Sequence, residues 1–484
     1  MRWWVVRRSV HSSICVALLS LATIVGIIIS QHISLKLFDS ILWCVGAVLC
    51  IGVGFWRRKL YVIPIIIVGG CLLGMWRGSL HVSELAALHG YVGQTIRMTG
   101  RLYDDADTNT TGDFVLRLND LKLGQASVAG KVWATTKNAD IRRGDVVTLT
   151  GKIASGFGSF SVTMYRAKLE AIVRPQPGDQ ARVIRDWFSA AIERAIPVPQ
   201  SSLGIGYLVG QKQALPVDLI EALKIAGLTH IVVASGYNLT ILVRLARRLF
   251  MRISKYTATL AASVMIASFV AITGLSPSMS RASLVASLSL AAWYYGRRFH
   301  PAVLLSFAAA TTVMVQPDYL AGDLGWELSF AAFAGVMMLA PLLQVYFFGD
   351  KKPGVIRQIL GETIAALIAT APILIGAFGQ FSNVGIIANL LVLPLVPLAM
   401  LLTFIAGIAA LVIPGFAIII GTPATWLLGY MIGIAQWLSH VSWAVTSIVV
   451  TPPVVGASYV LLIGICLYLR HVTKYDLRRV NIVE

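Results

Sequence analysis

Residues 385–413 read GIIANLLVLPLVPLAMLLTFIAGIAALVI and contain no charged side chain. A helix needs about 20 consecutive apolar residues to cross roughly 30 Å of hydrocarbon, and this stretch is longer than that. A water-soluble fold would have difficulty burying many such runs, because the core of a soluble domain grows slowly with chain length. The stretch therefore predicts a membrane-spanning segment, and it sets the fold class expected for the rest of the chain.

Similar apolar stretches lie on both sides of residues 385–413, and we expect about twelve spans in total. The predicted spans are 12–30, 40–56, 60–76, 229–250, 256–274, 277–296, 301–316, 326–348, 362–381, 385–413, 416–439 and 454–470. The composition agrees, since 57% of the residues are hydrophobic and 13% charged, whereas soluble proteins carry roughly 25% charged residues. We expect a polytopic α-helical membrane protein with one small soluble β-domain inserted near its start.

Basic residues predict the orientation, because cytoplasmic loops collect Lys and Arg. Arg57, Arg58 and Lys59 separate the second and third predicted spans, which places that loop and the N-terminus inside. We read the first span as an uncleaved helix. The segment after residue 76 then emerges outside, and the later basic clusters fall inside in the same count. We expect a membrane protein with both termini cytoplasmic and the β-domain outside. The later clusters lie at 247–255, 297–298, 351–357 and 474–479.

The predicted β-domain begins near residue 91 and ends near residue 174, where apolar runs shorten and alternate with polar residues. Turn-forming sequences at 108–112, 143–145 and 155–158 separate the expected strands. Five short strands in a segment of this size favour a small barrel, with an OB-fold as the leading interpretation. The expected strands are 94–102, 114–123, 130–136, 146–153 and 161–169.

This β-domain combines aromatic and basic residues, with twelve Lys/Arg against eight Asp/Glu. Rings beside cations suit single-stranded nucleic acid, because bases stack on the rings and phosphates meet the cations. The alternative is that most of these rings are core, although Phe157 and Phe160 lie in a Gly/Ser-rich loop that favours exposure. The candidate DNA-binding residues are Lys131, Trp133, Lys137, Arg142, Phe157, Phe160 and Arg166.

Residues 181–196 place apolar side chains on one face of a helix and charged ones on the other. This pattern is typical of a helix in the membrane interface, although packing on the barrel is an alternative. A second short helix, 217–226, is expected to end at Gly227. The expected domains are 1–78 (first spans), 90–175 (barrel), 180–228 (interfacial helices), 229–471 (membrane channel domain) and 472–484 (cytoplasmic tail).

Three polar motifs interrupt the apolar background. The first, residues 227–238, reads GLTHIVVASGYN; the second, 273–282, reads TGLSPSMSRA, with Ser276 and Pro277 in N-cap and N1 positions. The third, 325–330, reads GWELSF. A buried Arg281 in a membrane helix suggests a phosphate or carboxylate partner, and Glu327 is one candidate; snorkelling to the interface is the alternative. The candidate translocation residues are His230, Ser235, Gly236, Asn238, Ser276, Ser278, Arg281, Glu327 and Ser329.

These motifs, in this order and behind an OB-like insert, resemble the ComEC family, the inner-membrane channel proteins of natural DNA transformation. The family shows motifs like GLxHLLAISGLH, TGLxPSxxRA and QLSF. This chain departs from them with Asn238 in place of the usual His and Glu327 in place of the usual Gln. Many members also carry a C-terminal metallo-β-lactamase-like domain. We expect a form that lacks it, since the sequence has no HxHxDH cluster.

The resemblance implies import of single-stranded DNA into the cytoplasm. Its expected partners are single-stranded DNA, membrane lipids, an external DNA receptor, a cytoplasmic helicase or translocase and a separate nuclease, and the chain is a possible homo-oligomer. Residues 124–131 (GQASVAGK) do not match a Walker A loop, so a separate cytoplasmic motor protein is expected. None of the five cysteines has metal-type spacing, and we expect no cofactor, metal or enzymatic activity.

Two rival functions remain from the sequence. A transporter or flippase for another anionic polymer or lipid fits the composition equally well. An intramembrane serine protease would use Ser235 as nucleophile and His440 as base, but Val233 stands where such a motif has glycine.

Overall fold

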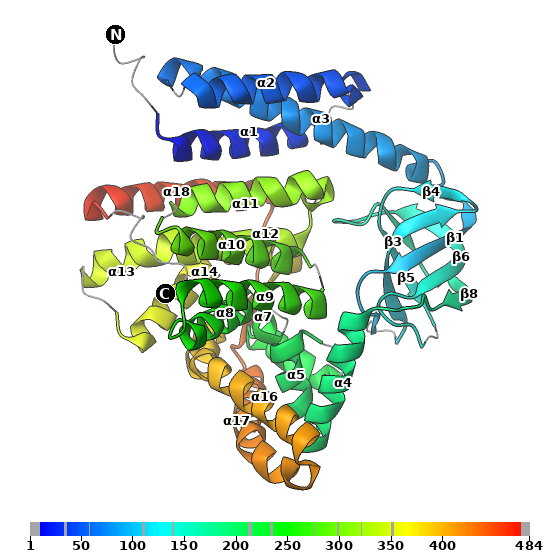
Figure 1. The fold of residues 1–484 in the computed structure, drawn as a ribbon, viewed down its shortest axis with the longest axis vertical. Helices are drawn as coiled ribbons and strands as arrows, with labels where there is room; N and C mark the ends of the chain where they lie inside the picture. The colour runs from blue at the N-terminus through cyan, green and yellow to red at the C-terminus, as the bar shows by residue number, and fades with distance from the viewer. Residues whose placement is uncertain are drawn as a thin grey trace. The chain divides into compact units, whose positions relative to one another are not determined.

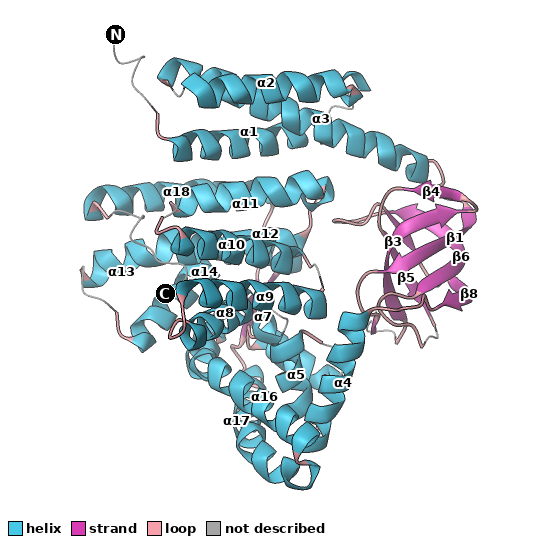
Figure 2. Cartoon of the chain, viewed as in Figure 1, coloured by secondary structure: helices cyan, strands magenta, loops and turns pink. Residues whose placement is uncertain are grey.

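The computed structural model describes residues 10–32, 36–57, 59–108, 112–137, 140–211, 215–232, 236–274, 276–297, 300–320, 322–349 and 353–475. The chain divides into two compact units. One consists of Met1–Gln180 with Ala302–Trp326, and the other of Ala181–Pro301 with Glu327–Glu484. Figure 1 traces the elements along the chain, and Figure 2 shows that most of them are helices, with a group of strands forming one β-domain.

The first unit starts with three helices and continues into the β-domain. Its helical elements are α1 (Ser12–His32), η2 (Lys36–Asp39), α2 (Ile41–Arg57), η3 (Leu60–Val62), α3 (Ile63–His89), α11 (Pro301–Val315), η4 (Pro317–Leu320) and the start of α12 (Leu324–Ala334). Its strands are β1 (Thr95–Leu102), β2 (Asp107–Thr108), β3 (Phe114–Leu123), β4 (Ala126–Val128), β5 (Val132–Thr136), β6 (Val146–Ser155), β7 (Val162–Met164) and β8 (Lys168–Val173).

Helix α3 packs against α1 along a row of glycines spaced four residues apart, at Gly70, Gly74 and Gly78. A Cβ built at Gly74 would overlap the carbonyl oxygen of Thr23 on α1. Glycines at this spacing let the backbones of two membrane helices approach closely, which strengthens van der Waals packing where lipid supplies no hydrophobic driving force. The row therefore fixes how α3 lies on α1.

The β-domain is a closed barrel. Its strands follow the order β1-β3-β5-β7-β6, and β6 pairs back with β1 along Thr95–Arg101. All neighbours are antiparallel except β5 and β7, which run parallel. Numbered along the chain, these five strands have the order 1-2-3-5-4-1, which fits the five-stranded Greek-key barrel of the OB-fold. Alternate side chains, such as Leu116 and Leu118 on β3, are fully buried and fill its interior.

The sequence prediction of the barrel is confirmed, with one change at its end. Residues 161–169 were expected to form a single strand, but they divide into β7 and the start of β8. Arg166 lies between them in the left-handed region (φ 49°), where its backbone N–H donates to Thr135 Oγ1 at 2.8 Å. This turn allows β7 to pair with β5 while β8 pairs with β6.

The regular elements of the second unit, as far as its residues are described, are helices and one short strand pair, β9 with β10. Its elements are α4 (Gln180–Ala195), α5 (Gln200–Val209), α6 (Val217–Ile225), α7 (Thr229–Val232), α8 (Gly236–Phe250), α9 (Lys255–Thr273), α10 (Pro277–Tyr294), the remainder of α12, a π-helix (Gly335–Leu339), α13 (Ala340–Phe348), α14 (Val355–Phe378), β9 (Gln380–Ser382), α15 (Gly385–Val392), η6 (Leu393–Leu395), α16 (Val396–Val412), η7 (Pro414–Phe416), α17 (Ala417–Ser439), β10 (Val445–Ser447) and α18 (Pro452–Thr473).

Eight helical segments of the described residues are long and apolar enough to span a membrane. They cover eight of the twelve predicted spans, and α2 and α11 are shorter apolar helices at two more. The two other predictions, 229–250 and 277–296, coincide with α7–α8 and α10, which fall outside both groups. These two segments carry the first two polar motifs, in which Arg, Ser and Asn side chains replace apolar ones. The chain is a polytopic helical membrane protein.

Helix α4 divides its surface differently from the amphipathic pattern of the sequence. Ala191 and Ile192 are buried, and Ile192 packs with Phe188 at Gly407 of α16. Arg185, expected on the polar face, is also buried and pairs with Asp186. An apolar strip remains exposed and consists of Val183, Ile184 and Trp187. The next predicted helix ends as expected, with Gly227 at a positive φ of 70° after α6.

Candidate functional site

The topology of the barrel defines the surface on which an OB-fold takes an oligonucleotide. That surface covers the second and third barrel strands and the loops between strands one and two and between strands four and five. Here these are β3, β5, residues 103–113 and residues 156–161. The candidate residues Trp133 on β5 and Phe157 and Phe160 in the last loop all fall on it.

Four aromatic rings form a continuous cluster on this surface. Trp133 contacts Phe157 and Tyr165 edge to face, with ring centroids 5.6 and 5.4 Å apart, and Phe157 contacts Phe160 at 5.5 Å. Phe157 is 51% exposed and Tyr165 58% exposed, whereas Trp133 and Phe160 are half-buried. The buried edges hold the cluster in place, and the exposed rings leave π-faces free for stacking.

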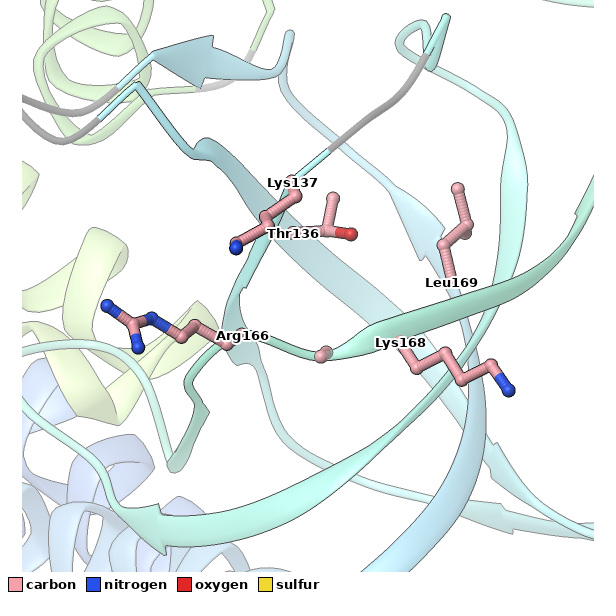
Figure 3. Close-up of a pocket in the computed structure, with 6 residues that line it drawn as sticks. Thr136, Lys137, Arg166, Lys168 and Leu169 are labelled. Carbon is pink, nitrogen blue, oxygen red and sulfur yellow. The ribbon is translucent and has the colours of Figure 1, made fainter.

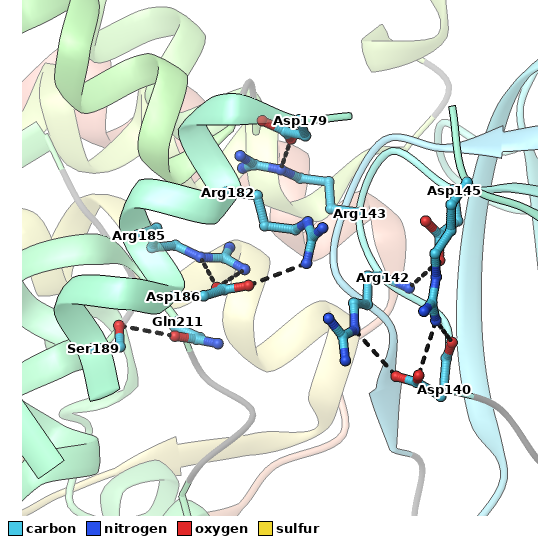
Figure 4. Close-up of polar contacts among 11 residues, drawn as sticks. Asp140, Arg142, Arg143, Asp145, Asp179, Arg182, Arg185, Asp186, Ser189 and Gln211 are labelled. Atoms are coloured by element: carbon cyan, nitrogen blue, oxygen red, sulfur yellow. Dashed lines mark hydrogen bonds and ion pairs between the residues drawn. The ribbon is translucent and has the colours of Figure 1, made fainter. Parts of the chain in front are cut away.

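Most arginines of the barrel are already paired with carboxylates. Arg142 donates to Asp140 at 3.1 Å, and Arg143 donates to Asp179 at 2.7 Å (Figure 4). Hydrogen bonds from Arg174 and Arg142 lower the pKa of the Asp140 carboxyl below its usual value. The candidate Arg142 is therefore charge-compensated within the protein. Other compensated arginines are Arg97, Arg117 and Arg174.

Lys131 also has partners within the protein, namely two aromatic rings and more distant carboxylates. Its amine lies 4.9 Å from the ring centroid of Tyr103 and 5.8 Å from that of Tyr319. Burial lowers the pKa of Lys131, and the nearby carboxyls of Asp318 and Asp323 partly oppose that shift. The half-buried position of Lys131 thus differs from the exposed positions of Lys137 and Arg166.

Lys137, Arg166 and Lys168 line a surface pocket of about 450 Å³, together with Thr136, Ala167 and Leu169. Figure 3 shows the side chains of Lys137 and Arg166 extending to one side and Lys168 to the other. No carboxylate lines the pocket, and none of the three cations makes an ion pair with another described residue. Positive charge on both sides of a pocket without a counter-charge favours an anionic ligand.

A second polar cluster joins two of the motifs in the helical unit. The Nε atom of Arg281 donates to Ser329 Oγ at 2.7 Å, and Ser329 in turn donates to Ser278 Oγ at 3.4 Å. The guanidinium also lies over the ring of Phe333, with its carbon 5.1 Å from the ring centroid. Within the described part of the chain Arg281 makes no ion pair, so Glu327, one candidate partner from the sequence, does not pair with it.

The start of α8 approaches the same arginine. A Cβ added to Gly236 would lie 3.2 Å from Arg281 Nη2, so a larger residue there would press on the guanidinium. Helix N-termini carry partial positive charge from their unpaired N–H groups. The helix terminus and Arg281 together make a region that favours an anion.

The other translocation candidates differ in burial and in their contacts. Ser276 caps α10 as expected, with its Oγ accepting from Met279 N at 3.2 Å. Asn238 is fully buried and donates to the carbonyl oxygen of Tyr207 at 3.1 Å, which ties α8 to α5. His230 is exposed on α7, Glu327 lies in the first turn of α12, and Ser235 falls outside the described residues. His440, the base of the protease hypothesis, is bound to Gln436 O at 2.6 Å.

Sequence reasoning missed Lys168 as a pocket residue and the partnership of Arg281 with Ser329. Lys168 stands two residues after Arg166, beyond the left-handed turn, and both residues line one pocket. Ser329 was itself a candidate, but no spacing rule links it to Arg281 across 48 residues.

Comparison with known proteins identifies the helical region. Residues 207–473 match the family described as Competence protein, and this region holds all three polar motifs but not the barrel. ComE operon protein 3 of Bacillus subtilis (strain 168) is 26% identical over 222 residues, or 44% of this chain. That similarity spans only 27% of the relative's own length. No solved structure is significantly similar. Because the match covers more than half of the chain, this protein belongs to the Competence protein family.

Proposed function

We propose that this chain forms a path by which single-stranded DNA crosses the cytoplasmic membrane during natural transformation. The family supports a role in competence, and the polytopic helical fold supplies a membrane domain. A polyanion cannot cross hydrocarbon unaided, because burying each charge costs several kcal/mol or more. The protein must therefore offer polar and positively charged groups along the route.

The observation that carries this proposal is the environment of Arg281. A cation in a membrane helix is costly unless it has a partner, and such residues usually mark the path of a substrate. Arg281 has one hydroxyl acceptor and one ring, but no carboxylate within ion-pair distance in the described residues. Its remaining N–H groups and the start of α8 suit successive phosphates of a passing strand.

The barrel contributes a receptor surface to the same proposal. Its exposed rings, Phe157 and Tyr165, would stack bases, while Lys137 and Arg166 would meet phosphates. The basic-loop pattern favours an external barrel with both termini in the cytoplasm. The exposed strip of α4, at Val183, Ile184 and Trp187, supports placement of that helix in the membrane interface.

The partners follow from the same chemistry. The chain has no Walker A match, so a cytoplasmic helicase or translocase would pull the strand, and a separate nuclease would degrade its complement. An external receptor would deliver DNA to the barrel. The chain would act as a monomer or as a homo-oligomer.

Uptake of labelled DNA tests the proposal in naturally competent cells that lack their own copy of this chain. The wild-type chain should restore nuclease-protected cytoplasmic DNA, and Arg281→Ala should reduce it to background. Arg281→Lys should retain part of the import, because the charge remains but the planar fork of hydrogen-bond donors is lost. Membrane levels and melting temperatures of the purified variants control for folding. Normal import by a folded Arg281→Ala chain would overturn the role of the arginine.

A further inference from the structure

We infer that the pocket between the end of β5 and the β7–β8 turn holds one backbone phosphodiester of a single strand, next to the base stacked on Tyr165. This inference rests on the proposed role of the barrel and adds a specific subsite to it. The pocket residues are Lys137, Arg166 and Lys168, with Thr136 as a further lining residue.

Three barrel cations that make no ion pair with a described residue meet at this pocket. Arg97, Arg117, Arg142, Arg143 and Arg174 all pair with carboxylates. Glu170, the carboxylate nearest to the pocket in sequence, is held elsewhere, accepting from Arg97 and from Thr150 at 2.7 Å each. The pocket cations therefore keep their full charge for a ligand from outside the protein.

Backbone geometry fixes the pocket beside the aromatic cluster. The backbone N–H groups of Arg166 and Ala167 donate to Thr135 Oγ1 and to the carbonyl oxygen of Thr135, so the turn is bound to the end of β5. Tyr165 immediately precedes this turn and contacts Trp133 at 5.4 Å. A base on the Tyr165 ring and a phosphate in the pocket are then neighbouring parts of one nucleotide chain.

The rings decide between the possible sources of the phosphate. A lipid headgroup offers an anion to the pocket but no flat group for Tyr165 and Phe157 to stack on. A nucleic acid strand offers both at regular spacing, and every base has a π-face. Figure 3 shows Lys168 extending to the side opposite Lys137 and Arg166, which adds a third cation at the same pocket.

The salt dependence of binding measures the neutralisation of phosphates directly. Full-length protein in detergent micelles would be titrated with a labelled thymidine oligonucleotide over a range of salt concentrations. The slope of log K against log salt changes by about 0.7 for each phosphate of a single strand that a variant no longer neutralises, and the pocket is inferred to hold one phosphate. Lys137→Gln/Arg166→Gln should show that change.

The matched control removes the same charge elsewhere on the barrel. Arg101 on β1 and Lys152 on β6 are exposed and lie outside both the pocket lining and the strands and loops of the binding surface. Arg101→Gln/Lys152→Gln should keep a slope close to that of the wild type. An equal change in both double variants, or none in the pocket variant, would overturn the subsite while leaving binding by the barrel intact.

Two further results separate the subsite from the proposed function. A wild-type chain that binds no oligonucleotide would overturn both, whereas weaker binding by Phe157→Ala with an unchanged slope for the pocket variant overturns the subsite only. Binding to vesicles containing anionic lipid that depends on Lys137 and Arg166, without oligonucleotide binding, would assign the pocket to a headgroup and overturn the inference.

Discussion

Arg281 donates through its Nε atom to Ser329 Oγ over 2.7 Å, which links the early turns of α10 and α12. The two residues come from separate motifs of the Competence region, and Ser278 extends the chain of hydroxyls. A serine hydroxyl accepts from the guanidinium without neutralising it, unlike a carboxylate. The positive charge is thus held in position but remains available to an anion.

Ser329→Ala should lower DNA import on the order of tenfold, because a hydrogen bond to a charged group contributes about 1.5–3 kcal/mol and orients the guanidinium. Ser329→Thr should retain import, since it keeps the hydroxyl. The control is Ser283→Ala on α10, whose hydroxyl bonds only to Ser280 O among the described residues. Import is measured as nuclease-protected label, and equal import by Ser329→Ala and Ser283→Ala would contradict the role of this bond.

Phe157→Ala/Tyr165→Ala should weaken oligonucleotide binding by about 30-fold or more, since two stacked bases together contribute about 2–6 kcal/mol. The measurement is fluorescence anisotropy with full-length protein. Tyr91→Ala is the matched control, because Tyr91 is an exposed aromatic residue that lies outside the ring cluster. If the double variant and the control bind equally well, the rings do not form the binding surface.

The lowered pKa of Lys131 predicts that the stability of the protein depends on pH. This pKa is lower in the folded protein than its ordinary value of 10.5. Between the lowered pKa and 10.5 the unfolded chain holds more protons, so the free energy of unfolding rises with pH in that window. The melting temperature of the wild type should therefore increase relative to Lys131→Met as pH rises through the alkaline range. A constant difference between the two proteins would show that Lys131 is not perturbed.

Gly74→Ala should destabilise the α1–α3 pair by about 1–3 kcal/mol, because the added Cβ meets the backbone carbonyl of Thr23 and the helices must separate. Gly52→Ala on α2 meets no atom within 4 Å and should be neutral or slightly stabilising. Thermal unfolding in detergent distinguishes the two. Equal melting temperatures would mean that α1 and α3 do not pack through this glycine.

Local patterns along the sequence determined several parts of this protein. Long apolar runs predict membrane helices because each helix needs about 20 apolar residues to cross the hydrocarbon core of the membrane. Alternation over residues 91–174 predicts the barrel strands because successive side chains point to opposite faces. Ser276 predicts the start of α10, since a cap acts within three residues.

Only the tertiary structure decided which of the predicted residues act together. Lys131 and Lys137 flank one strand in the sequence, yet the fold half-buries Lys131 beside Tyr103 and Tyr319 and leaves Lys137 at an open pocket. Glu327 and Ser329 belong to the same motif, and the sequence does not show which of them contacts Arg281. In the folded protein the contact is made by Ser329. The physical reason is that charge compensation depends on contacts between distant segments, whereas helix length, strand alternation and capping depend on neighbours along the chain.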